Sequence, residues 1–170
     1  DDGVRTNSFD LKLHDVRETS VGRKAQYDSQ RRGVHVSDLQ TGDMTINGFQ
    51  VRATDDTDDN VSVSFGSGSA IAKARAINAI SEQTGVTARA GETIVIANRQ
   101  ISAFTLDQTQ NFAINGVQVA GFEISTFDAD GALRQAINAH HEETGVVASL
   151  TSQGELQLVA KDGRNIQIAY

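Results

Sequence analysis

The sequence predicts an α+β fold that is mostly β: two tandem units, each with a β-hairpin, a helix and antiparallel strands, and extra strands at the N-terminus. The main observation is an internal repeat, because the motifs ING, AINA and TGV occur twice in the same order. A second observation is that the apolar period changes within each copy, from helical spacing to strict alternation. The paired motifs begin at Ile46 and Ile114, at Ala76 and Ala136, and at Thr84 and Thr144.

The repeat also predicts how the chain is divided, since each copy of such a repeat is one supersecondary unit. We expect N-terminal strands and a loop over 1–40, packed on the repeats, and repeat units over 41–105 and 106–170. The ING motifs lie 68 residues apart and the other pairs 60, so the first copy holds eight extra residues. They fall around TDDTDDNVS (54–62), whose acidic composition predicts an exposed loop.

Each unit is expected to open with a tight hairpin, in MTINGFQV (44–51) and FAINGVQV (112–119). An Asn-Gly pair between apolar residues is the strongest short hairpin signal. Both central residues of a type I′ turn need positive φ, which glycine adopts freely and asparagine tolerates. The two ING motifs are therefore interpreted as hairpin turns.

A helix is predicted next in each unit, over SAIAKARAINAISEQTG (69–85) and DGALRQAINAHHEETG (130–145). Apolar residues recur every three or four positions, which predicts one buried stripe on each helix and a polar face towards water. The stripes comprise Ile71, Ala74, Ile77 and Ile80 in the first copy, and Leu133, Ala136, Ile137 and His140 in the second.

The ends of both helices carry recognisable signals. Ser69 is a suitable N-cap for the first helix, and Asp128 or Asp130 for the second, because their side-chain oxygens accept from free backbone amides. Gly85 and Gly145 are expected to end the helices in the left-handed conformation, which favours glycine.

Alternating apolar residues predict strands after each helix and near the N-terminus. Turns are expected at Gly91, at 152–154 and at 161–163. The predicted strands are VTARA (86–90), TIVIA (93–97) and ISAFTL (101–106) in the first copy, VVASL (146–150), ELQLVA (155–160) and NIQIAY (165–170) in the second, and FDLKL (9–13) and GVHVSDL (33–39) before the repeats.

Composition excludes several classes of function. The chain has 15 Lys and Arg against 22 Asp and Glu, a net charge of −7, and its longest basic run is Arg31-Arg32. Nucleic acids and anionic membranes both need a positive field, so neither is an expected partner. No apolar stretch approaches the roughly 20 residues of a membrane helix. Cysteine is absent, which excludes disulfides, thiolate catalysis and cysteine-based zinc sites. Aromatic residues make up 5% of the chain, which is poor material for an aromatic-lined ligand pocket.

Two acidic stretches, 55–60 and 128–131, carry the carboxylates of a possible metal site. The first stretch supplies the side-chain oxygens that Ca²⁺ prefers, from Asp55, Asp56, Asp58, Asp59 and Asn60. An EF-hand loop starting at the first of them would need glycine at position 60 and glutamate at 66, where the chain has Asn and Gly. A solvated acidic loop is therefore the favoured interpretation, and a helix cap is favoured for 128–131.

Two further motifs resemble catalytic or binding sites only in part. His140 and His141 precede two glutamates, but a zinc peptidase needs His-Glu-x-x-His, with the histidines one helical turn apart. Gly66-Ser67-Gly68-Ser69 precedes a helix, but it lacks the Gly-Lys-Ser/Thr ending of a phosphate-binding loop. We interpret it as a turn and N-cap. The sequence therefore assigns no catalytic, cofactor-binding or metal-binding residue, and it predicts no cofactor.

Taken in order, these motifs resemble the repeat in the variable outer region of bacterial flagellins. The second copy shows the whole pattern: ING at 114–116, AINA at 136–139, TGV at 144–146, an apolar strand at 156–160 and DGRNI at 162–166. The first copy shows the first three elements and then departs, with ANRQISAF in place of AKDGRNI.

The resemblance implies a structural protein rather than an enzyme: the surface-exposed outer domain of a flagellin subunit in an extracellular flagellar filament that serves motility. Flagellins polymerise through long helical ends, which this chain does not show. Its expected partners are therefore other copies of the same subunit, through those ends, and the 170-residue chain alone is expected to be monomeric. The alternatives are an outer domain of a flagellar cap or hook–filament junction protein, and a surface adhesin module that binds glycans or a host.

Overall fold

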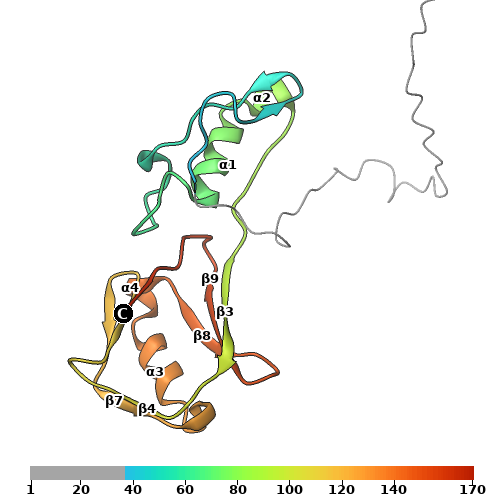
Figure 1. Ribbon diagram of the computed structural model, residues 1–170. Helices are drawn as coiled ribbons and strands as arrows, with labels where there is room; N and C mark the ends of the chain where they lie inside the picture. Colours follow the sequence, from blue (N-terminus) through green and yellow to red (C-terminus); the bar gives the residue numbers. More distant parts are fainter. Residues whose placement is uncertain (1–36) are drawn as a thin grey trace, which may run out of the picture.

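The computed structural model describes residues 37–170. The strand predicted at 9–13 lies outside them, as does most of the one at 33–39, whose last three residues form no strand. The described chain folds into two bodies joined by an extended segment at about residues 86–92 (Figure 1). Within this part of the chain, no helix is both long and apolar enough to cross a membrane.

The first body holds the first ING, AINA and TGV motifs. Its hairpin pairs β1 (Thr45–Ile46) with β2 (Phe49–Gln50). A 3₁₀ turn, η1 (Asp56–Asp58), follows, and then two helices, α1 (Ala70–Asn78) and α2 (Ser81–Thr84). The buried apolar side chains of this body are few and small: Val51, Ala72 and Ala76.

The second body is larger and consists of three antiparallel sheets around one helix. The strand orders are β3-β9-β8, β10-β5-β6 and β4-β7. The helix α3 contacts β8 and β7. Its elements are β3 (Thr93–Gln100), β4 (Phe104–Leu106), β5 (Phe112–Ile114), β6 (Val117–Val119), β7 (Phe122–Ile124), η2 (Thr126–Asp128), α3 (Ala132–Ala139), α4 (His141–Thr144), β8 (Val147–Leu150), β9 (Glu155–Ala160) and β10 (Ile168–Ala169).

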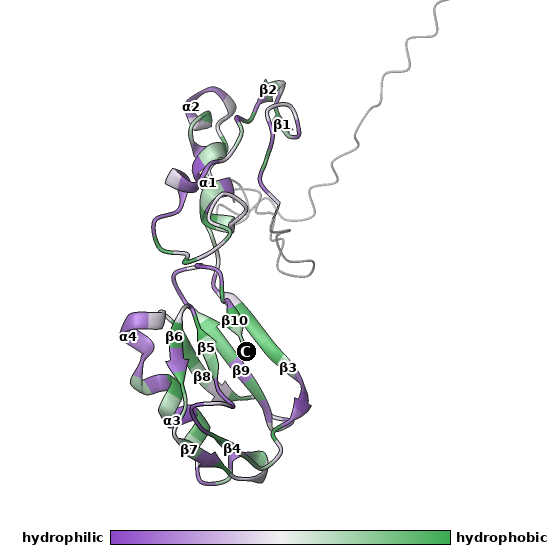
Figure 2. Ribbon diagram, turned by 60° about the vertical axis from the view of Figure 1, so that its left-hand side comes forward, coloured by the Kyte–Doolittle hydropathy of each residue, from purple (hydrophilic) through white to green (hydrophobic). Residues whose placement is uncertain are grey.

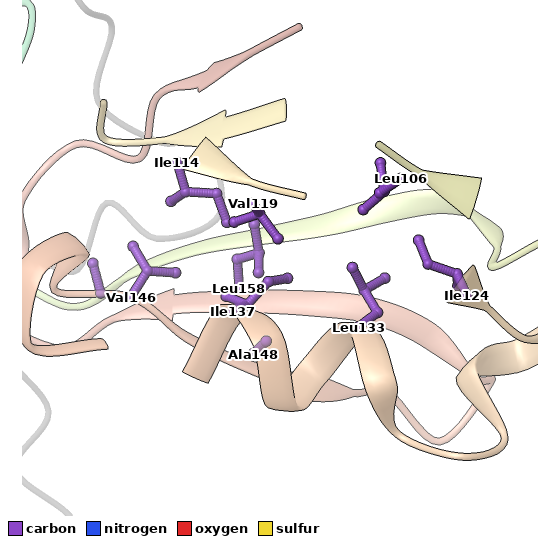
Figure 3. Close-up of a cluster of buried hydrophobic side chains, with 10 residues drawn as sticks. Leu106, Ile114, Val119, Ile124, Leu133, Ile137, Val146, Ala148 and Leu158 are labelled. Carbon is purple, nitrogen blue, oxygen red and sulfur yellow. The ribbon is translucent and has the colours of Figure 1, made fainter. Parts of the chain in front are cut away.

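A single apolar core lies between these sheets and α3 (Figure 3). The hairpin β5–β6, the helix and the sheet β3-β9-β8 all contribute to it, and the apolar colouring concentrates on their strands (Figure 2). Leu133 and Ile137, two members of the predicted helical stripe, are 5% and 1% exposed. The other buried members are Leu106, Ile114, Val119, Ile124, Val146, Ala148, Leu158 and Ala160.

The structure confirms the α+β class, both hairpins and the left-handed glycines after the helices. Each predicted helix is interrupted: α1 ends at Asn78 and α3 at Ala139, and a short helix follows each. The strands predicted at 93–97 and 155–160 form as β3 and β9, whereas those predicted at 101–106 and 165–170 are shorter. The short strand β7 was not predicted from the sequence.

The prediction of a strand at 86–90 was wrong, because this segment pairs with no strand among residues 37–170. Its counterpart β8 pairs with β9, the next strand of the second copy. In the first copy the next strand, β3, also pairs with β9. It therefore belongs to the sheet of the second body and forms no hairpin with 86–90. Likewise β4 pairs with β7. The division of the chain into repeat units at residue 105 stays a prediction. The strands β3 and β4 precede or span that position, but their hydrogen-bond partners, β9 and β7, come after it.

Candidate functional site

The Asn of each ING motif connects the hairpin turn to the end of the helical segment. Asn47 and Asn115 have φ values of 50° and 48°, and the glycine after each is also left-handed, as a type I′ turn requires. The Nδ2 group of Asn47 donates to the carbonyl of Thr84 at 2.9 Å, and that of Asn115 donates to the carbonyl of Thr144 at 2.7 Å. Each ING turn is therefore fastened to the TGV motif of its own copy.

The Asn of each AINA motif binds the backbone that follows the helices. Asn138 accepts from the amide of Ala148 at 2.7 Å and donates to its carbonyl at 3.0 Å. Asn78 makes the same pair of bonds with Ala88, each at 2.8 Å. This two-bond contact imitates a strand pairing, and in the first copy it holds residues 86–90 in place although they form no strand.

The Thr and Gly of each TGV motif shape the exit from the helices. The hydroxyl of Thr144 donates to the carbonyl of His140 at 2.9 Å and accepts from the amide of Val146 at 3.1 Å. Gly145 then adopts φ of 71°, and its amide donates to the carbonyl of His141 at 2.8 Å. The first copy repeats every one of these bonds at the same distances with Thr84, Ile80, Val86, Gly85 and Ser81.

These contacts form one arrangement, which we call the ING–AINA–TGV frame: Asn47, Asn78, Thr84 and Gly85 in the first copy, and Asn115, Asn138, Thr144 and Gly145 in the second. Every polar side chain of the frame hydrogen-bonds to a backbone group. The frame therefore holds a hairpin, a helix and the following backbone segment together. Its threonine hydroxyls donate to backbone carbonyls, and its members include no acid–base pair.

The frame residues coincide with a known family signature. The sequence model of the family described as Flagellin hook IN motif matches residues 111–162, which contain the whole second frame. Flagellin A of Helicobacter pylori is 37% identical over 131 residues, which are 75% of this chain and 25% of that protein. The chain is similar to bacterial flagellins over most of its length. This confirms the resemblance inferred from the ordered motifs.

Other flagellins show the same similarity. Flagellin A of Helicobacter mustelae is 39% identical over 107 residues, covering 62% of this chain and 21% of that protein. Flagellin B of Helicobacter pylori is 42% identical over 60 residues, covering 35% of this chain and 12% of that protein. The chain thus spans about a quarter or less of the length of these flagellins.

The two frame glycines differ in their surroundings, which predicts unequal effects of substitution. Both Gly85→Ala and Gly145→Ala introduce a side chain at a left-handed φ, an effect of about 1 kcal/mol. A Cβ at Gly85 meets nothing within 4 Å, whereas one at Gly145 overlaps the Arg164 guanidinium. That guanidinium donates to the Thr144 carbonyl at 3.2 Å and must move.

We therefore expect Gly145→Ala to lower the free energy of unfolding by about 2 kcal/mol, and Gly85→Ala by about 1 kcal/mol. Thermal unfolding followed by circular dichroism checks the order of the two variants. Removing the obstructing side chain with Arg164→Ala should bring the further effect of Gly145→Ala close to that of Gly85→Ala. Equal losses for the two glycine variants in the unmodified chain would contradict the prediction.

The acidic insertion of the first copy is only partly the exposed loop that its composition predicted: 55–57 and 60–61 are exposed, but two of its carboxylates are not. Asp58 and Asp59 are only 4% and 5% exposed. The Arg52 guanidinium donates two bonds to the Asp58 carboxylate, at 2.6 and 2.8 Å. Asp59 Oδ1 accepts from the amides of Val61 and Ser62 at 2.9 and 3.0 Å. These donors satisfy both oxygens of Asp58 and Oδ1 of Asp59, as buried charge requires, whereas Asp59 Oδ2 is buried without a hydrogen-bond partner among the described residues.

The ion pair with Arg52 makes the stability of this body dependent on pH. The hydrogen bond from the guanidinium holds the pKa of Asp58 below its usual range, against the opposing effect of burial. A depressed pKa adds stability that is fully present above the unfolded value of about 3.9 and is lost as the pH falls through the folded value. Below about pH 4, the wild-type chain should therefore lose stability more steeply than Asp58→Asn.

Urea unfolding across the acidic range, followed through amide exchange of peptides from 51–62, measures this difference. Other carboxylates with depressed pKa values, such as Asp107 and Asp162, act equally in both proteins and cancel. Parallel pH profiles for the wild type and Asp58→Asn would refute the role of this ion pair.

The predicted cap of the first helix is confirmed, whereas the N-cap residue of α3 is Gly131 and the two predicted aspartates bind first-turn amides from positions before it. Ser69 Oγ accepts from the amide of Ala72 at 3.0 Å. Asp128 is fully buried and accepts from the amides of Leu133 and Arg134, while Asp130 accepts from that of Ala132.

The glycine–serine segment before α1 forms a turn. The amide of Gly68 donates to the carbonyl of Phe65 at 3.2 Å, and that of Ser69 donates to the carbonyl of Gly66 at 3.0 Å. The amide of Ser67 is bound by the Asp56 carboxylate at 3.1 Å. An anionic side chain therefore already occupies the position that a phosphate would need.

His140 and His141 lie where the helical segment is interrupted, and each faces its own glutamate. His141 Nε2 is 2.9 Å from Glu142, and His140 Nδ1 is 3.6 Å from Glu143. Across residues 37–170, no three His, Cys, Asp or Glu side chains gather in a metal-binding arrangement.

One contact that sequence reasoning missed connects the two bodies. The amide of Asn165 donates to the hydroxyl of Ser62 at 2.9 Å. Its Nδ2 group donates to the carbonyls of Ser64 and Phe65 at 3.0 and 3.1 Å. Asn165 belongs to the DGRNI element of the second copy, and its partners follow the acidic insertion of the first. The sequence gives one hint of this contact: the DGRNI element occurs in the second copy and has no counterpart in the first.

Proposed function

We propose that this chain is the surface-exposed outer domain of a flagellin subunit, with a structural role in the extracellular bacterial flagellar filament that serves motility. The observation that carries the proposal is the ING–AINA–TGV frame, which occurs twice with the same hydrogen bonds in a chain similar to flagellins. A frame whose polar groups all bind the backbone stabilises a fold and leaves none of them for turnover of a substrate.

The proposed work of the domain is to set the surface of the filament. A net charge of −7 on each copy of this segment would keep neighbouring filaments apart over about one Debye length, ~10 Å at 0.1 M salt. Polymerisation is assigned to other parts of the subunit, with further copies of the subunit as partners. The 170-residue chain alone should therefore sediment as a monomer of 18.2 kDa.

Immunogold electron microscopy tests the proposal, with antibody raised against the folded chain and applied to cells that produce it. Gold along the whole length of the filaments is the expected result. Gold confined to the tip or to the hook–filament junction would reassign the chain to a cap or junction protein. Label on the cell body with bare filaments would overturn the flagellar proposal in favour of an adhesin module. Cells that lack the gene provide the control for antibody specificity.

A further inference from the structure

Hydrogen bonds join the two bodies where Asn165 meets the stretch 62–65. Asn165 donates three bonds to this stretch, at 2.9, 3.0 and 3.1 Å. It belongs to DGRNI (162–166), the element that the first copy lacks. Its partners begin at the end of the acidic stretch 54–62, around which the eight extra residues of the first copy fall. The insertion of one copy and the additional element of the other therefore meet at one contact.

The stretch 62–65 is held in place by its own body. Asp59 Oδ1 accepts from the amide of Ser62 at 3.0 Å, and the amide of Gly68 donates to the carbonyl of Phe65 at 3.2 Å. The side chain of Phe65 is 65% exposed, so the contact with the second body rests on hydrogen bonds rather than on burial of this ring. The acceptors that Asn165 reaches are therefore fixed before the contact is made.

Asn165 is held in the same way by the second body. Directly before it, the Arg164 guanidinium donates to the carbonyl of Thr144 at 3.2 Å. Two residues after it, the amide of Gln167 donates to Asn115 Oδ1 at 2.8 Å. The chain on either side of Asn165 is thus fastened to the second frame, so its three bonds connect that frame with the first body.

The element that carries Asn165 also packs on the connection between the bodies. Gly163 has a φ of 82°, and a Cβ at this position would lie 2.6 Å from the carbonyl oxygen of Gly91 and 2.8 Å from Ala90 Cβ. So close an approach of two backbone segments requires a glycine. The element DGRNI therefore contacts both the first body and the segment that leads away from it.

That connection is short and has no secondary structure of its own. Ala88 is fastened to the first body by its two bonds with Asn78, and Thr93 begins β3 of the second. The four residues between them, 89–92, form no helix or strand, and Figure 1 shows this part as a single extended connection. A few such residues can absorb the dihedral changes of a hinge, so by themselves they do not fix an orientation.

We propose that DGRNI and the stretch 62–65 form a clasp that fixes the orientation of the first body on the second, and that the bodies hinge about 89–92 when it opens. The clasp closes through the three bonds of Asn165. The close approach of Gly163 to Gly91 limits bending of the hinge while the clasp is closed.

Distances between two nitroxide spin labels, measured by pulsed electron paramagnetic resonance, test the clasp. The chain has no cysteine, so Gln83→Cys in the first body and Ser152→Cys in the second provide one labelled pair at exposed positions. We expect one narrow distance distribution. Asn165→Ala removes the two Nδ2 bonds and should raise the population of other distances by about tenfold. Adding Ser62→Ala removes the third bond and should raise it further.

Asn98→Ala is the matched control. Asn98 lies exposed on β3 of the same body, and its side chain makes no hydrogen bond within residues 37–170. This variant should keep the distance distribution of the unmodified labelled chain. Amide exchange of peptides from α1 and β9 should be the same in every variant, because both bodies stay folded when the clasp opens.

Three outcomes would overturn the proposal. A distribution that is already as broad with Asn165 and Ser62 in place as without them would show that the clasp is open in solution. Equally narrow distributions in all the variants would show that 89–92 alone fixes the orientation. Where exchange reveals that Asn165→Ala loosens a body, Ser62→Ala alone decides, because it leaves DGRNI intact. An unchanged distribution in that variant would also refute the clasp.

Discussion

Replacing Asn115 by alanine is expected to lower the free energy of unfolding by about 3 kcal/mol. The side chain is 5% exposed and is used at both ends: Nδ2 donates to the Thr144 carbonyl, and Oδ1 accepts from the Gln167 amide at 2.8 Å. Alanine leaves the Gln167 amide without an acceptor inside the protein. It also has no side-chain group to support the left-handed φ of 48° at this turn.

The first copy provides the matched control. Asn47 has the same role in its turn and a similar φ of 50°, but it is exposed, and its one bond among the described residues goes to the Thr84 carbonyl. We expect Asn47→Ala to lower the free energy of unfolding by about 1–2 kcal/mol, since water can replace the lost bond.

Native-state amide exchange measures the two effects separately, because the two asparagines lie in different bodies and one global transition cannot be assumed. Peptides containing β5 and β10 should exchange faster in Asn115→Ala, and peptides containing β1 and β2 in Asn47→Ala. If the two variants lose equal stability, the bond to Gln167 and the burial of Asn115 have no energetic weight.

The hairpin turns could be predicted from the sequence because the signal is local. A type I′ turn requires positive φ at two consecutive residues, and Asn-Gly is among the few residue pairs that adopt this without a large steric cost. The same is true of Gly85 and Gly145, whose position directly after a helical pattern is sufficient to indicate a left-handed end. Predictions that rest on two or three adjacent residues were therefore correct at the level of single dihedral angles.

The failures lie where pairing over long distances decides the structure. The apolar alternation at 86–90 is typical of a strand, yet β3 pairs with β9, so the segment has no strand partner in the described part of the chain. Asp58 and Asp59 are acidic in sequence but buried in the fold, where Arg52 binds the first and local amides bind one oxygen of the second. No periodicity encodes which guanidinium will reach a given carboxylate.

The candidate site shows the same division. The sequence identified the repeated motifs, and the structure shows why their polar members occur in that order. Asn138 binds Ala148, ten residues onward, and Asn115 binds Thr144, 29 residues onward. Such contacts join elements whose relative position is set by the whole unit, so the motifs predicted a repeat but not the bonds within it.

Replacing Asp128 by alanine is expected to destabilise the second body by about 3 kcal/mol. The carboxylate is fully buried and accepts from the amide of Leu133 at 2.8 Å, and from the amide and Nε of Arg134 at 3.3 and 2.7 Å. Its backbone is left-handed, with φ of 49°, which aspartate tolerates better than alanine. The substitution thus removes the cap of α3 and leaves Arg134 without its buried partner.

Two variants separate these contributions, with thermal unfolding and exchange of peptides from α3 as the readout. Asp128→Asn keeps an acceptor for the Leu133 amide and tolerates positive φ, so it should lose only about half as much stability as Asp128→Ala. Ser69→Ala removes the equivalent cap of α1, a single bond of 3.0 Å, and should cost about 1 kcal/mol. If Asp128→Asn is as damaging as Asp128→Ala, the ion pair with Arg134, rather than the cap, holds the start of α3.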